Sequence, residues 1–205
     1  MQQSRTVSLV VPGSELSLWL RPLGKGARIP CRVGVSVERL LQEQLGLPSD
    51  YIERRVRTVF INGRPVDDLS QSTVADGDEL ALAGALPGLV GICMTRNSPV
   101  AGFRQGITHQ PRASAVAQGA VLLKLFNTVG QEVGPRVLEH GVLLPVDVVR
   151  ALASCALERG HSPQSVHLRE PQDQDCGEVA SGATGLSLLA QLPGREPIFL
   201  QVATV

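Results

Sequence analysis

The sequence predicts an α+β protein of two domains, and three observations support this. Apolar and β-branched segments of strand length recur between Gly, Pro, Asn and Asp turn signals. Other segments carry apolar residues at helical spacing and end at a glycine. A stretch rich in Pro, Gly and polar residues divides the 205-residue chain. We therefore expect one domain over 1–92, a linker or surface loop over 93–112, and an α+β domain over 113–205.

The first half reads as strands arranged around one helix. Its expected elements are strands at 6–11 and 16–22, a helix at 36–45, and strands at 56–62 and 78–83. Pro12-Gly13-Ser14 predicts a hairpin turn between the first two strands, and the segment 24–34 either lengthens this hairpin or supplies its second strand. Ser36 is the expected N-cap of the helix and Gly46 its stop signal. The expected core residues are Val37, Leu40, Leu41, Val56, Phe60, Leu80 and Leu82.

Two turn motifs in this half carry a resemblance to a known family. The segments FINGRPVDDL and VADGDELALAGALPG resemble the C-terminal half of the small sulfur-carrier proteins of thiamine and molybdopterin synthesis. The similarity covers about residues 36–91 and rests most on Asn62-Gly63 and Asp76-Gly77-Asp78. It implies a ubiquitin-like β-grasp domain, in which a mixed sheet wraps around one helix.

The same resemblance raises a question about residues 84–91. The carriers end in a free Gly-Gly whose carboxylate is converted to a thiocarboxylate, and the two glycines let the tail thread a narrow channel. This sequence has only the tail-like glycines Gly84, Gly88 and Gly91, and 114 residues follow the last of them. We therefore expect no carrier chemistry in the intact chain.

The second half reads as helices followed by strands. The apolar spacing predicts helices over 113–134, over a short segment beginning at Pro135, and over 145–159. The expected strands are 165–170, 186–192 and 197–203. No family resemblance guides this half.

Composition excludes several classes of function. Nineteen basic residues balance nineteen acidic ones, and aromatic residues make up only 3% of the chain. These values give no drive toward nucleic acid or an anionic membrane surface. The sequence has no secretory signal, and its four separated cysteines are typical of free thiols. We expect a cytoplasmic protein without a cofactor.

The sequence gives only weak support for catalytic or metal-ligating residues. His161, His167 and Cys176 come near one another in the C-terminal half, but their spacing matches no zinc motif. Acidic neighbours disfavour a thiolate at Cys176, which argues against a cysteine nucleophile. These three residues remain the only site candidates there, and an acidic surface loop is the simpler interpretation.

The sequence therefore favours a non-catalytic protein-binding or accessory role. The expected partner is an unidentified protein, and a homodimer is expected because near-zero net charge gives little repulsion between copies. The alternatives are a sulfur-carrier precursor cleaved near Gly91 and an enzyme with a site between the two halves. Residues 84–92 are expected to be ordered and packed against the second half, so that Leu89→Asp would lower the melting temperature.

Overall fold

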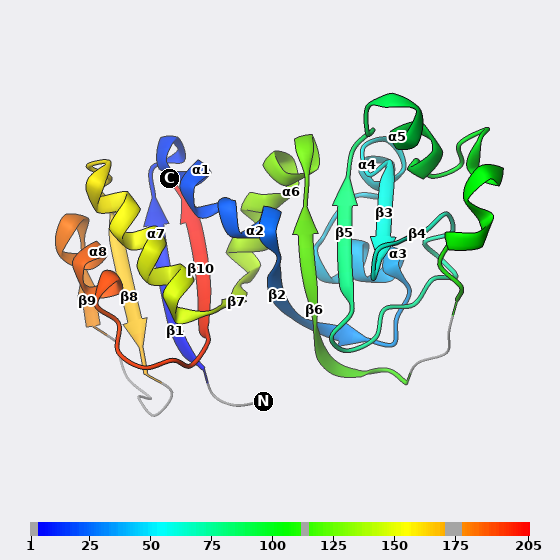
Figure 1. Cartoon of the computed structure of the whole chain (residues 1–205). Helices are drawn as coiled ribbons and strands as arrows, with labels where there is room; N and C mark the ends of the chain where they lie inside the picture. The colour runs from blue at the N-terminus through cyan, green and yellow to red at the C-terminus, as the bar shows by residue number, and fades with distance from the viewer. Residues whose placement is uncertain (1–3, 112–114, 171–177) are drawn as a thin grey trace. The chain divides into compact units, whose positions relative to one another are not determined.

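The computed structural model describes residues 4–111, 115–170 and 178–205, and it confirms the α+β class. The chain divides into two compact units, one formed by Met1–Pro22 with Pro135–Val205 and the other by Leu23–Gly134. The first unit is therefore built from both ends of the chain. This division differs from the predicted contiguous domains 1–92 and 113–205. Figure 1 labels the helices and strands of both units.

The unit Leu23–Gly134 contains a mixed sheet with the strand order β4-β3-β5-β6-β2. Its strands are β2 (Ala27–Val33), β3 (Thr58–Ile61), β4 (Arg64–Pro65), β5 (Glu79–Ala83) and β6 (Ala117–Leu125). The pair β5 and β6 is parallel, and the other neighbouring strands are antiparallel. As predicted, β3 and β5 lie side by side in one sheet.

One predicted helix forms the centre of this unit. It consists of α3 (Val37–Arg39) and the π-helical turn η2 (Leu40–Gln44), and the Ser36 hydroxyl accepts a hydrogen bond from the Arg39 amide. Val37, Leu40 and Leu41 are fully buried. The other predicted core residues are buried as well, except Phe60, which is half-buried because Val59 and Ile61 occupy the inner positions of β3. The short helix α4 (Ser49–Arg54) follows.

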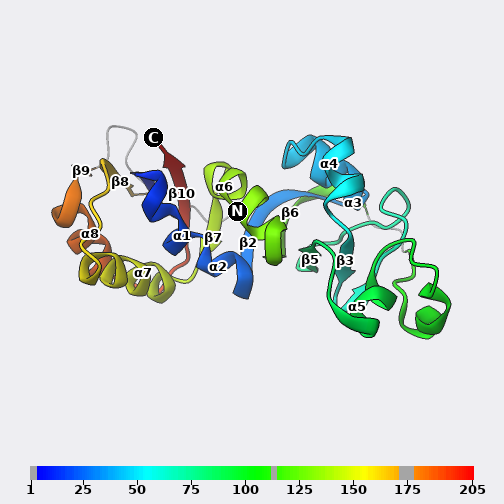
Figure 2. The same ribbon diagram turned by 90° about the horizontal axis from the view of Figure 1, so that it is seen from above.

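Two further helical segments, α5 (Gly88–Met94) and η3 (Ala101–Ile107), lie between β5 and β6 in the sequence. Figure 2 shows α3 and α4 on one side of β3 and β5, and α5 on the other side. The predicted linker 93–112 thus contains the end of α5 and all of η3.

The predicted helix over 113–134 is wrong in its first half. Residues Ala117–Leu125 form β6, in which Val121, Leu123 and Leu125 are buried at every second position. The helix α6 (Asn127–His140) begins only afterwards, and Pro135 lies within it rather than at its start. The apolar residues at 116 and 126, which suggested helical spacing, are exposed.

The unit Met1–Pro22 with Pro135–Val205 has the strand order β7-β10-β1-β8-β9. Its strands are β1 (Arg5–Val11), β7 (Val142–Leu144), β8 (Ser165–Arg169), β9 (Glu178–Ala180) and β10 (Ile198–Thr204). The first and last strands, β1 and β10, pair in parallel. Helices α7 (Val146–Glu158) and α8 (Gly182–Ala190) lie on the same face of these strands (Figure 1).

Two predicted strands of this unit are helices. Residues 16–22 lie in α1 (Leu16–Trp19), which continues η1 (Gly13–Glu15), and in the start of α2 (Arg21–Lys25). Here Trp19 and Leu23 are buried four residues apart, so the apparent alternation of LSLWLRP misled the prediction. Similarly, LSLLAQL belongs to α8, whose buried Leu186 and Leu189 lie three residues apart. Helices and strands therefore alternate here instead of forming a helical run followed by strands.

The Asn62-Gly63 and Asp76-Gly77-Asp78 motifs form one hydrogen-bonded bracket. Asn62 Nδ2 donates to Asp78 Oδ1 over 2.8 Å, and the Glu79 amide donates to Asn62 Oδ1 over 2.9 Å. Asp78 is buried and also accepts from the Ala75 amide. Asn62 and Gly63 both have positive φ, as the tight turn between β3 and β4 requires. These residues therefore stabilise the two turns and join them to each other.

Removing this bracket should destabilise the protein. We expect Asn62→Ala to lower the free energy of unfolding by about 1–2 kcal/mol, because two side-chain hydrogen bonds are lost and one leaves the buried Asp78 less satisfied. Chemical denaturation measures the change. Asn97→Ala is the matched control, since Asn97 has nearly the same positive φ but no side-chain hydrogen bond within the described residues. An equal loss in both variants would assign the effect to the turn conformation alone.

Candidate apolar docking site

The most distinctive surface of the described chain lies on α5 and η3. Large apolar side chains that a globular protein normally buries are exposed here. We call these five residues the α5–η3 face: Leu89, Val90, Ile92, Phe103 and Ile107. Their exposed fractions are 74%, 71%, 51%, 87% and 49%, respectively. Both segments belong to the unit Leu23–Gly134.

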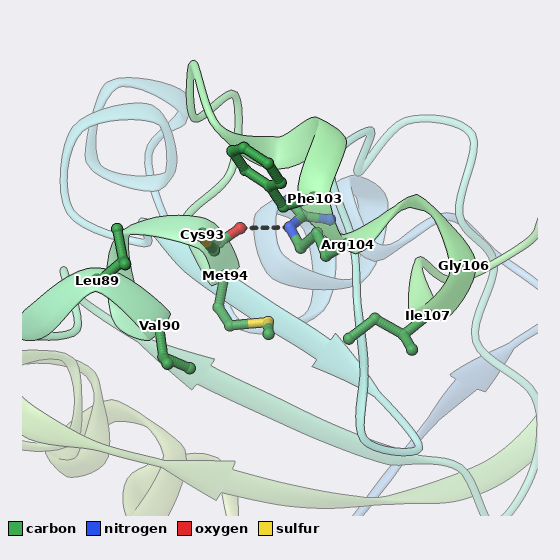
Figure 3. Close-up of a pocket in the computed structure, with 8 residues that line it drawn as sticks. All are labelled: Leu89, Val90, Cys93, Met94, Phe103, Arg104, Gly106 and Ile107. Carbon is green, nitrogen blue, oxygen red and sulfur yellow. Dashed lines mark hydrogen bonds between the residues drawn. The ribbon is translucent and has the colours of Figure 1, made fainter.

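A pocket of about 500 Å³ opens between the two helical segments of this face (Figure 3). Its lining residues are Leu89, Val90, Cys93, Met94, Phe103, Arg104, Gly106 and Ile107. Leu89 and Val90 project from α5, and Phe103 projects from η3 on the opposite side of the pocket (Figure 3). The size and apolar lining fall within the range of pockets that accept apolar groups.

One buried cation holds the two helical segments together. The Arg104 side chain is 2% exposed and forms an ion pair with Asp67 at 2.6 Å. Its Nε donates to the Cys93 carbonyl at the end of α5, and its Nη1 donates to Thr108 Oγ1. The dashed line in Figure 3 marks the bond to Cys93. Arg104 therefore fixes the geometry of the pocket and offers little charge to a ligand.

The tail-like glycines have structural explanations. Gly84 is buried, and its carbonyl accepts a hydrogen bond from Thr58 Oγ1. Gly88 has a φ of +78° at the start of α5, a conformation that favours glycine. Gly91 is buried within α5, where a Cβ would lie 2.6 Å from the Leu86 carbonyl carbon. Residues 84–91 therefore do not form an extended tail.

Residues 88–94 form a helix, but the predicted burial of the large apolar side chains in 84–92 is wrong. Leu86 is only partly covered, and Leu89, Val90 and Ile92 point largely into solvent. The physical reason is that the face of α5 that packs against the rest of the chain carries Gly91. This glycine packs closely against the Leu86 backbone, and the large side chains of α5 lie on its solvent-facing side. Sequence reasoning treated this apolar run as buried and missed Phe103 and Ile107 entirely.

This correction reverses the predicted effect of an aspartate at position 89. At concentrations where the chain is monomeric, we now expect Leu89→Asp to change the free energy of unfolding by less than about 0.5 kcal/mol, as is usual for exposed positions. Leu82→Asp is the matched control, because Leu82 is fully buried in β5 and an unpaired charge there should unfold the protein. A loss of several kcal/mol from Leu89→Asp at such concentrations would show that this side chain is buried within the chain itself.

The C-terminal candidates do not assemble into a site. His161 Nδ1 lies 3.9 Å from Glu15 Oε2, and the neighbouring Ser162 amide donates to the same carboxylate over 2.9 Å. This cluster ties the end of α7 to η1. His167 is exposed on β8, and Cys176 lies outside the described residues. Within the described ranges, no group of three His, Cys, Asp or Glu residues could hold a metal ion.

Two other features lack the properties of a reactive site. Burial raises the pKa of the Cys31 thiol to about 11, which keeps the thiol neutral.

A second, polar pocket of about 420 Å³ is lined in part by Arg96. The Arg96 guanidinium donates hydrogen bonds to the backbone carbonyls of Ile52 and Val56. Burial, followed by repulsion from Arg57, lowers the pKa of Arg96. Its guanidinium is thus engaged with the backbone.

Comparisons of the chain with protein-family models, with curated proteins and with solved structures find no match. Of the helices described here, none combines the length and apolar character needed to cross a membrane.

Proposed function

We propose that this is a non-catalytic binding or accessory protein that acts by protein–protein contact through the α5–η3 face. The observation that carries the proposal is that α5 and η3 expose five large apolar residues, four of which, all except Ile92, line one pocket. Contiguous exposed apolar surface on a folded protein is typical of interaction sites. The side chains are also held in place by the buried Arg104, so the face is preformed.

The framework that presents this face is proposed to be a β-grasp unit similar to the sulfur carriers. The mixed sheet with the buried helix at Val37–Gln44 and the bracket of Asn62 with Asp78 support this proposal. The unit differs from the expected arrangement in one respect. The strand paired with β2 is β6, which follows the last expected strand, and not the residues 6–11.

The two alternatives have weaker support. A carrier precursor cut near Gly91 requires a protease to open α5, because Gly91 is buried inside that helix. The enzyme with a site between the two halves stays an untested alternative, whereas an enzyme acting in the apolar pocket would find no histidine or carboxylate among its eight lining residues to serve as a general base. The proposed partner is a cytoplasmic protein rather than nucleic acid or a membrane, since the balanced charge favours neither.

Photo-crosslinking in the native cell tests this function. A photoreactive phenylalanine analogue at position 103 should form a covalent adduct with a protein, because Phe103 is 87% exposed and lines the pocket of the face. The analogue at Val179, which is 60% exposed in the other unit, is the matched control and should not. Adding Leu89→Asp should remove the adduct at position 103. Absence of a protein adduct at 103, or equal labelling at 179, would contradict the proposal.

A further inference from the structure

The size and shape of the α5–η3 face indicate what kind of molecule covers it. A small apolar molecule could fill the pocket, but it would leave the outward sides of Leu89, Val90 and Phe103 in water. These side chains are 74%, 71% and 87% exposed. Only a surface of protein size covers both the pocket and its apolar rim.

The face also carries two complementary shapes. Phe103 is a projecting aromatic ring, and the adjoining pocket of about 500 Å³ is larger than such a ring needs. In Figure 3 the ring extends from η3 toward α5 near Cys93, and its 87% exposure shows that it projects from the surface. A surface with both a projection and a hollow can pair with itself about a twofold axis, so that each copy inserts its ring into the other.

Charge favours the same occupant. The only formally charged residue lining the pocket is Arg104, whose side chain is 2% exposed and paired with Asp67. Two copies that meet at this pocket therefore bring no exposed like charges of its described lining residues together, which would otherwise oppose self-association. The whole chain adds no long-range repulsion, since its formal net charge is zero. A strongly charged partner would find no complementary charge here.

We propose that a second copy of this chain occupies the α5–η3 face, with Phe103 of each copy in the pocket of the other. This inference rests on the proposed function and names the partner of the same site. In the resulting isologous dimer, Phe103 lies in the interface centre, where aromatic residues usually contribute most to affinity. Leu89 and Val90 form the surrounding apolar contact.

Sedimentation velocity over a wide concentration range tests the dimer. The wild type should show a species of twice the 21.8 kDa chain mass. Phe103→Asp and Leu89→Asp should each weaken the dimer at least about tenfold, as expected for charges placed in an interface core. Val179→Asp, at an exposed apolar position of the other unit, should leave it unchanged. Circular dichroism checks that each variant is folded. If an aspartate variant of the face does not fold, Phe103→Ser is used in its place.

The outcomes separate this inference from the proposed function. A monomeric wild type at every concentration, or a dimer that persists in both face variants, overturns the second copy as occupant. Native mass spectrometry that finds a small apolar molecule on a monomer also overturns it. If the wild type is monomeric and position 103 still crosslinks to another protein in the cell, the inference fails and the proposed function stands. If neither the dimer nor the crosslink is found, both fail.

Discussion

Replacing Arg104 with Ala is expected to lower the free energy of unfolding by about 2–3 kcal/mol, less than the ~3–5 kcal/mol of a fully buried ion pair because the Asp67 side chain is 34% exposed. Arg104 is the most deeply buried charged side chain described, at 2% exposure. Its loss leaves the Asp67 carboxylate without its cation and the Cys93 carbonyl without a donor. Because this side chain joins α5 to η3, the variant should also lose the docking face. Chemical denaturation and the photo-crosslink at position 103 measure the two effects.

Two control variants make this prediction specific. Arg104→Lys retains the charge but cannot reproduce the forked geometry, so a partial loss is expected. Arg64→Ala removes an exposed arginine from the short strand β4 and should change stability by less than about 0.5 kcal/mol. If Arg104→Ala costs no more than Arg64→Ala, the guanidinium does not organise the face.

Gly91→Ala is expected to lower the free energy of unfolding by about 3 kcal/mol, at the upper end of the usual cost of overpacking. The added Cβ would lie 2.6 Å from the Leu86 carbonyl carbon and 2.8 Å from the Leu86 Cβ. The first neighbour is backbone, which cannot rotate away as a side chain does. The variant should therefore displace α5 and reduce association through the face. Thermal unfolding and sedimentation velocity measure these effects.

Gly102→Ala provides the matched control. Gly102 lies in η3, and a Cβ there meets nothing within 4 Å. Its substitution should leave stability unchanged or slightly increased, because alanine restricts the unfolded chain. Equal tolerance of alanine at both positions would mean that Gly91 is not needed for close packing, and the account of the tail-like glycines would be wrong.

Local signals in the sequence predicted the parts of the fold that depend on local physics. Ser36 and Gly46 set the ends of the central helix, and Asn62-Gly63 predicted the hairpin turn, because caps and positive-φ turns act within a few residues. The alternation in LSLWLRP and the helical spacing at 113–125 failed, since short apolar runs suit either a strand or a helix. Tertiary pairing decided both segments.

Nonlocal features could not be predicted from the sequence. The pairing of β2 with β6 joins segments separated by about half the chain, and no residue pattern in either strand specifies the other. The candidate site was hidden for a different reason. An apolar run such as 86–94 reads as buried, and only the close packing of Gly91 against Leu86 shows which side of α5 faces inward. Phe103, in a segment read as a linker, gave no signal at all.

Amide hydrogen exchange over residues 88–107 tests most directly the central claim that a second copy of this chain covers the α5–η3 face. Wild type and Phe103→Asp are compared at the same high concentration. Since Phe103 is 87% exposed, the substitution should leave the packing within each chain intact. The account predicts slower exchange of residues 88–107 in the wild type and equal exchange in the strands of both units. Equal exchange over residues 88–107 in the two proteins would contradict it.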